Sequence, residues 1–207
     1  CSSDLSFSQA TAFATSGTLT IGDEATDSFT YSGGAFAPSS PSAITLAGSI
    51  TTSSTTAGAG SVTLGDANTT LAITTNLTIN TSASNGNITI ANTIAGGGKA
   101  LTLDAGTGTI NITSALSNMG NLSFTGNEIN WSASIDGTGT LTLKPTTATY
   151  VINVGAATDA GSTTLDILSG EISLLGTNFT NITFGGASQT GNISLQGNLT
   201  VPGTASV

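Results

Sequence analysis

The stretch GNITIANTIAGGGKALTLDAGTGTINI, residues 86–112, contains three short segments of one type, ITI, LTL and INI. In each segment two aliphatic residues flank one small polar residue. Because successive side chains of a β-strand point to opposite faces, both aliphatic side chains fall on the same face. The stretch therefore predicts short strands that bury one face and are joined by turns of glycine, alanine and small polar residues.

Segments of this type recur as far as residue 201. They lie at 44–46, 62–64, 71–73, 77–79, 88–90, 101–103, 110–112, 122–124, 129–131, 141–143, 151–154, 165–167, 172–174, 182–184, 193–195 and 199–201. Every second segment repeats after 22 residues from 88 to 110 and after 19 residues from 110 to 129. A period of about 20 residues is typical of a solenoid. It predicts a coil that holds two strands.

The strands of a coil could instead form antiparallel hairpins, which tight Asn-Gly turns would favour. Asn-Gly occurs only at 85–86, and most links have five to eight residues. The links therefore favour arcs, with each coil pairing in parallel with the next, so that Ile88 stacks on Ile110 and Ile90 on Ile112. The predicted core ladder comprises Ile88, Ile90, Leu101, Leu103, Ile110, Ile112, Leu122, Phe124, Ile129 and Trp131.

The first 42 residues differ from the rest of the chain. They carry five of the ten aromatic residues and end near PSSP, residues 38–41. This predicts an N-terminal cap, or irregular first coils, over 1–42 and a β-solenoid repeat region over 43–207. Because the final residues, GNLTVPGTASV, follow a strand segment directly, we expect this region to continue into further coils or to dock another subunit at that end.

Charge excludes several functions. The net charge is −9, only 6% of residues are charged, and Lys99 and Lys144 are the only basic residues. Nucleic-acid binding needs many basic side chains, so it is not expected. No apolar run is long enough for a transmembrane helix. Histidine is absent, which removes histidine-based catalytic and metal sites, and no cofactor is expected.

Three candidate sites remain. CSSD at the start resembles the mature end of a bacterial lipoprotein, which makes Cys1 a lipidation candidate; the alternative is a simple chain boundary. In GDEATD, the carboxylates of Asp23, Glu24 and Asp27 form a weak calcium candidate, because Ca²⁺ prefers oxygen ligands; the alternative is a polar loop. A glycosidase could use two carboxylates, and Asp104 and Glu128 could lie on nearby faces; the alternative is solvated turn charges.

GNITIANTIAGGGKALTLDAGTGTINI and GNLSFTGNEINWSASIDGTGTLTLKP, at 120–145, resemble the repeats of filamentous-haemagglutinin-type and autotransporter-like bacterial surface proteins. The resemblance covers about residues 44–201. It implies an all-β, right-handed parallel β-helix and an extracellular or cell-surface location, with outer-membrane anchoring as one form. It also implies adhesion or matrix building.

The expected function is therefore structural and non-enzymatic: an adhesin, or a filament or matrix subunit that associates end to end through its strand edges. Surface carbohydrate is a second candidate partner. One alternative is a β-helix that binds or degrades polysaccharide. Another is an ice-binding solenoid, in which outward threonines such as Thr89, Thr102 and Thr142 would order water.

Overall fold

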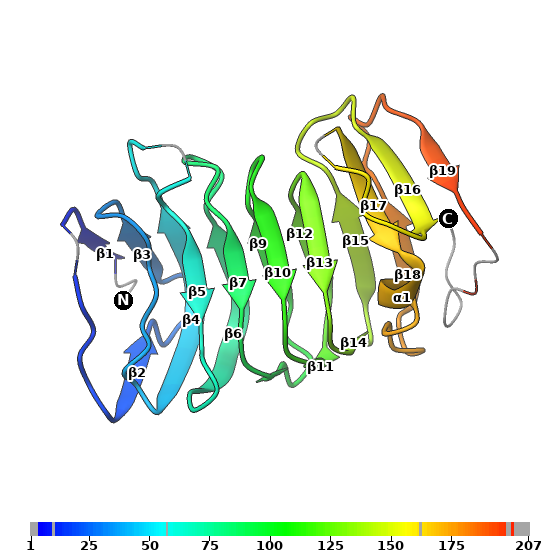
Figure 1. Cartoon of the computed structure of the whole chain (residues 1–207). Coiled ribbons are helices and arrows are strands. Elements are labelled where there is room, and N and C mark those ends of the chain that lie inside the picture. The colour runs from blue at the N-terminus through cyan, green and yellow to red at the C-terminus, as the bar shows by residue number, and fades with distance from the viewer. Residues whose placement is uncertain (1–3, 10, 57, 162, 198–199, 201–207) are drawn as a thin grey trace.

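The structure is a computed structural model that describes residues 4–9, 11–56, 58–161, 163–197 and 200. Almost all regular elements are parallel strands wound along one axis (Figure 1). The strands are β1 (Asp4–Phe7), β2 (Thr18–Ile21), β3 (Ser28–Tyr31), β4 (Ala43–Thr52), β5 (Val62–Leu64), β6 (Thr70–Asn80), β7 (Ile88–Ile90), β8 (Ile94–Ala95), β9 (Leu101–Asp104), β10 (Thr109–Ile112), β11 (Leu116–Met119), β12 (Leu122–Thr125), β13 (Glu128–Trp131), β14 (Ile135–Gly137), β15 (Thr140–Lys144), β16 (Val151–Ala156), β17 (Thr164–Leu168), β18 (Asn181–Phe184) and β19 (Ile193–Leu195). One short helix, α1 (Ser169–Ile172), follows β17.

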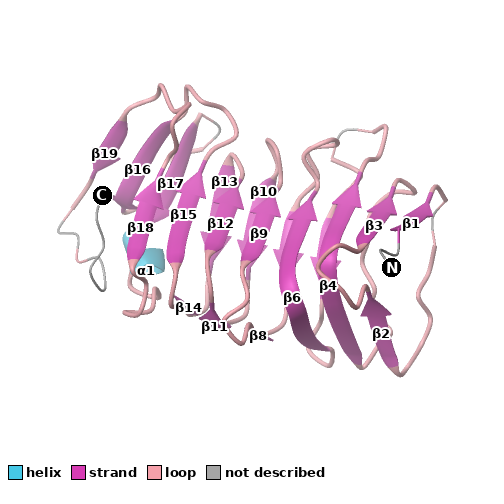
Figure 2. Cartoon of the chain, turned by 180° about the vertical axis from the view of Figure 1, so that it is seen from behind, coloured by secondary structure: helices cyan, strands magenta, loops and turns pink. Residues whose placement is uncertain are grey.

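The strands form three faces around a common core. Face one contains β2, the first halves of β4 and β6, and then β8, β11 and β14. Face two runs β1, β3, the second halves of β4 and β6, β9, β12, β15 and β18. Face three contains β5, β7, β10 and β13, followed by β17, β16 and β19. Figure 2 shows face two along its length. The chain is thus an all-β, parallel β-helix.

The expectation of two strands per coil was wrong, because a central coil has three. Face one supplies the additional strands β8, β11 and β14. The alternating pattern did not reveal them because β8 has two residues, and its single inward side chain is Ile94. Such a segment cannot show the apolar–polar–apolar repeat that marks faces two and three.

The predicted register is confirmed. Ile110 pairs with Ile88 on one side and with Ile129 on the other, and Ile112 pairs with Ile90 and Trp131. All ten residues of the predicted ladder are buried, and the most exposed of them, Trp131, is only 4% exposed. Apolar side chains of neighbouring coils therefore stack on one another, and the apolar area that they bury stabilises every coil.

The first strands extend the same sheets, because β2 and β3 both pair with β4, and β1 pairs with β3. Five rings pack together there at centroid distances from 5.2 to 6.5 Å, namely Phe7, Phe13, Phe29, Tyr31 and Phe36. The division into a cap and a repeat region at residue 42 stays a prediction.

Strand β4 bends from face one to face two at Gly48, where the pairing register with β6 shifts. Gly48 has a φ of 71°, and a Cβ there would lie 2.2 Å from the carbonyl oxygen of Asp27. Both the backbone conformation and the close approach therefore require glycine.

We expect Gly48→Ala to lower the free energy of unfolding by about 2–4 kcal/mol, combining left-handed strain with a backbone clash. Gly98→Ala is the matched control, since its φ is 79° but nothing lies within 4 Å of the added carbon. The control should lose only about 1–2 kcal/mol. Urea unfolding compares the two variants, and equal losses would show that the contact with Asp27 is unimportant.

Face three departs from the regular winding after β15. Strand β16 does not lie beside β13; β17 occupies that place and pairs with β16 on its other side. Strand β19 then pairs with the outer edge of β16. Face three therefore holds one more strand than the regular winding supplies at this end.

Candidate functional site: an acidic junction on face three

The junction between β13, β17 and α1 concentrates buried acidic side chains. Glu171 of α1 is 6% exposed, and its two carboxylate oxygens accept hydrogen bonds from the amides of Trp131 (3.0 Å) and Leu168 (2.8 Å). In return, the indole nitrogen of Trp131 donates to the carbonyl oxygen of Glu171 at 2.7 Å. The carboxylate thus connects β13 to the chain that leaves β17.

Asp166 of β17 is held in the same manner. Its carboxylate accepts hydrogen bonds from the Asn153 side chain (2.7 Å), the Ala160 amide (2.9 Å) and the Thr164 hydroxyl (2.7 Å). Burial acts to raise the pKa of Asp166, but these three donors outweigh it and lower the pKa below its ordinary value. Asp166 therefore stays ionised and fastens the loop between β16 and β17.

Glu128, at the start of β13, behaves in the opposite way. Burial, followed by repulsion from Asp159, Asp166 and Glu171, raises the pKa of Glu128 to about 7. Its Oε1 atom is buried and has no hydrogen-bond partner in the described part of the chain. Burial also raises the pKa of Glu171, against the lowering effect of its two amide donors.

One raised and one lowered carboxylic acid can in principle serve as a general acid and a nucleophile. A hollow of about 370 Å³ lies beside the junction, lined by Asn111, Ile112, Thr113, Asn130, Trp131, Ser132, Leu168 and Glu171. Neither Glu128 nor Asp166 lines it. This hollow therefore does not bring together the two acids with opposite pKa shifts.

We expect the raised pKa of Glu128 to make stability depend on pH. The protonated form is favoured in the folded chain, so its stabilising effect is complete below about pH 4.5, declines as the pH rises and is lost above about pH 7. Glu128→Gln should remove most of this decline. Urea midpoints at pH 5 and pH 8 measure it, and Asp104→Asn on face two, which should leave the decline intact, is the control.

The predicted pair, Asp104 and Glu128, lies on two different faces, and Asp104 is not among the acids that shift the pKa of Glu128. Asp104 lies at the end of β9 on face two, whereas Glu128 begins β13 on face three. The acids that influence Glu128 are Asp159, Asp166 and Glu171. Sequence reasoning missed this junction because 165–167 reads like any other strand segment, and nothing in it shows that β17 lies beside β13.

The calcium candidate likewise gains no support from the geometry. One carboxylate oxygen of Asp27 accepts hydrogen bonds from the amides of Asp23 (2.8 Å) and Glu24 (3.0 Å). Among the described residues, no three acidic, cysteine or histidine residues gather as a metal site. The carboxylate of Asp27 therefore stabilises the loop that contains Asp23 and Glu24. The lipidation candidate, Cys1, lies outside the described residues.

Asparagines directly before an inward-facing apolar residue of a strand have a structural role that sequence reasoning missed. The side-chain oxygens of Asn76, Asn87 and Asn121 each accept a hydrogen bond at 2.9 Å from a backbone amide one coil later, that of Ala100, Thr109 and Thr140 respectively. Each amide belongs to the residue aligned with the asparagine in the next strand. The recurring N-[IL]-[ST]-[IF] sequence was the available signal.

These observations define the chain as a parallel β-helix whose three buried acids, Asp27, Asp166 and Glu171, all accept hydrogen bonds from backbone amides. No protein-family profile, curated protein or solved structure matches it. No helix in the described part of the chain is long and apolar enough to cross a membrane.

Proposed function

We propose that this chain is a structural, non-enzymatic module of an extracellular or cell-surface filament, matrix or adhesin. The observation that carries the proposal is the in-register parallel stacking of the strands of face two. The column Leu5, Phe29, Ile50, Ile79, Leu103, Phe124, Leu143 and Phe184 crosses the whole of face two without interruption. Such a stack supplies length and rigidity rather than chemistry.

The disposition of the acids supports the same function. The three buried carboxylates accept hydrogen bonds from backbone amides at turns and strand ends, and the hollow beside the junction is lined by neither Glu128 nor Asp166. Trp131 is only 4% exposed and its indole nitrogen is engaged by Glu171. Its ring is therefore poorly placed to stack on a sugar.

The style of the repeats, which resembles that of filamentous-haemagglutinin-type proteins, supports a bacterial surface setting. In this setting the modules associate end to end. Negative-stain electron microscopy of the purified chain over a range of concentrations tests the assembly, with light scattering for mass. Fibres with a regular axial repeat are expected, and single rods at every concentration would contradict end-to-end association.

Ice binding is a second candidate, favoured by one column on face two. Ser28, Ser49, Thr78, Thr102, Ser123, Thr142 and Thr183 lie in register on seven neighbouring strands. The next outward column on that face includes Asp104 and Lys144, which interrupts a flat hydroxyl surface. A thermal-hysteresis assay with Thr102→Lys as the variant decides this candidate: wild-type activity that the variant loses would support it.

A further inference from the structure

The hollow beside the junction is open to the surface of face three. Residues 111–113 and 130–132, at the ends of β10 and β13, form one part of its lining, and Leu168 and Glu171 complete it. Its volume of about 370 Å³ lies within the range of roughly 300–1,000 Å³ that is usual for small-molecule sites. The hollow is therefore large enough to hold part of a ligand.

Two asparagine side chains in this lining are not used by the fold. Asn111 and Asn130 are aligned with each other on β10 and β13, where both are partly buried and face outward. No hydrogen bond within the described part of the chain engages either side-chain amide, whereas Asn87 bridges to the next coil and Asn153 donates to Asp166. Each amide therefore keeps its carbonyl oxygen and its NH₂ group for a ligand.

Strand stability does not explain asparagine at these two positions. The same outward column holds Thr63 on β5 and Thr89 on β7. Threonine is favoured in strands, whereas asparagine is depleted there. The column thus changes from threonine to asparagine on the two strands that line the hollow, as expected where side chains are chosen for contact with a ligand.

The lining selects an uncharged ligand that carries hydroxyl groups. Neither Lys99 nor Lys144 lines the hollow, and both carboxylate oxygens of Glu171 already accept hydrogen bonds from backbone amides. An anionic ligand would meet no basic group there and would be repelled by the net charge of −9. The hydroxyl of Ser132 adds a polar group to the two amides, and Leu168 adds an apolar one.

An extended peptide fits this place less well than a sugar. Peptides that bind sheets usually add as a strand along a free edge. Strand β10 is paired with β7 on one side and with β13 on the other, and β17 lies beside the far side of β13. Both strands at the hollow are therefore flanked on both sides and offer no edge.

We propose that the hollow binds one ring of a neutral carbohydrate, whose hydroxyl groups form hydrogen bonds with the amides of Asn111 and Asn130. Aligned residues on neighbouring strands lie about 4.8 Å apart, a distance that a single sugar ring spans. Trp131 is only 4% exposed, so recognition depends on the amides and not on ring stacking. The inference rests on the adhesin form of the function proposed above and specifies the class of its ligand.

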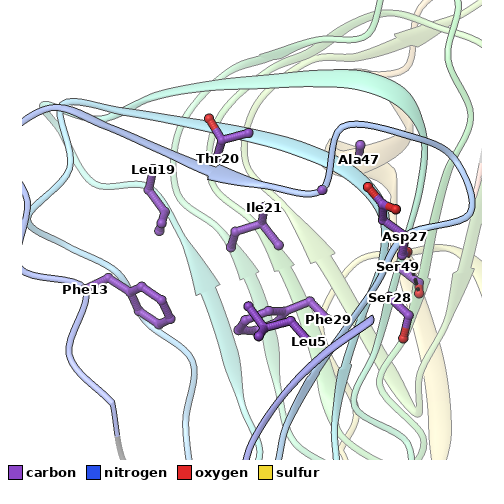
Figure 3. A pocket seen from close by; sticks show the side chains of 11 residues that line it. Leu5, Phe13, Leu19, Thr20, Ile21, Asp27, Ser28, Phe29, Ala47 and Ser49 are labelled. Atoms are coloured by element: carbon purple, nitrogen blue, oxygen red, sulfur yellow. Dashed lines mark hydrogen bonds between the residues drawn. The ribbon is translucent and has the colours of Figure 1, made fainter. Parts of the chain in front are cut away.

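The mainly apolar cavity between β1, β2 and β3 is a poorer site for such a ligand (Figure 3). Its volume is about 130 Å³, and apolar side chains that include Leu19, Ile21 and Phe29 line it. Sugar hydroxyls that lost water there without gaining partners would cost free energy. A sugar that did bind in this cavity would not respond to changes at Asn111 and Asn130.

The fluorescence of Trp131 tests the proposal, because Trp131 is the only tryptophan in the chain and lines the hollow. We expect a saturable blue shift when the purified chain is titrated with neutral oligosaccharides of glucose, galactose, mannose or N-acetylglucosamine. Oligogalacturonate, which is anionic, and an uncharged serine–threonine peptide should cause no shift. A response to either of these two alone, or no response to any neutral oligosaccharide up to its solubility limit, would overturn the proposal.

The double variant Asn111→Thr, Asn130→Thr assigns the binding to the hollow. It places at both positions the residue that the same column holds at 63 and 89, so circular dichroism and urea unfolding should stay close to wild type. The loss of two hydrogen-bonding amides should weaken binding about tenfold or more. Asn68→Thr, at an exposed position between β5 and β6, is the matched control and should bind as wild type does.

Electron microscopy of the same samples separates this inference from the function on which it rests. Wild-type affinity in the double variant would overturn the carbohydrate site. Fibres without any carbohydrate binding would also overturn the site but leave the filament proposal standing. Single rods that bind the oligosaccharide and lose it in the double variant would contradict end-to-end association and support the site.

Discussion

Replacing Ile110 by alanine is expected to lower the free energy of unfolding by about 2–5 kcal/mol. Ile110 is fully buried and stacks between Ile88 and Ile129. The shortened side chain leaves a cavity in the middle of the ladder, and the strands on both sides are too short to move independently into it. Because each coil depends on its neighbours, the loss should appear in a single cooperative transition.

Thr102→Ala is the matched control for Ile110→Ala. Thr102 lies in the middle of the same stack, but its side chain points outward and is only half-buried. Its replacement should cost no more than about 1 kcal/mol, the span of strand propensities. Urea unfolding measures both variants. Equal losses would mean that the aliphatic ladder is not the main source of stability.

Replacing Glu171 by alanine is expected to cost about 3 kcal/mol, because it leaves the amides of Trp131, which is buried, and Leu168, which is partly buried, without their carboxylate acceptor. The damage should be local to α1 and β17. Hydrogen exchange at these two amides should accelerate. The fluorescence of Trp131, the only tryptophan in the chain, should report the opening before the rest of the stack unfolds.

Glu171→Gln is the control for this prediction. Glutamine keeps one oxygen acceptor and nearly the same shape, but its amide group cannot accept the second hydrogen bond. It should therefore lose roughly half as much stability as the alanine variant. If the alanine variant matched wild type in both stability and hydrogen exchange, the carboxylate would not hold the junction together.

The regular part of the fold could be predicted from the sequence because the pattern and the packing carry the same information. In ITI at 88–90 and INI at 110–112, the alternation of apolar and polar residues is enough to predict which side chains point inward. Parallel stacking then aligns them, so Ile88 meets Ile110 without reference to any distant residue.

The junction could not be predicted in that way. The segment 151–154 reads like any other strand, yet β16 is displaced along the axis and β17 takes the place beside β13. This rearrangement brings Asp159, Asp166 and Glu171 near Glu128, whose pKa is raised first by burial and then by repulsion from these acids. Trp131 and Glu171, 40 residues apart in the sequence, become neighbours because the chain winds around the axis. The local alternation of apolar and polar residues does not predict such a contact.

The sequence by itself determined the type of strand, the parallel stacking and the ladder from Ile88 to Trp131, since these depend on residue type and on a period of two. The tertiary structure decided that each central coil has a third strand. It also decided that the buried acids accept hydrogen bonds from backbone amides. The physical reason is that a strand of two or three residues, or a single buried acid, obtains its hydrogen-bond partners from neighbouring coils. These partners are distant in the sequence and are not marked by the local pattern.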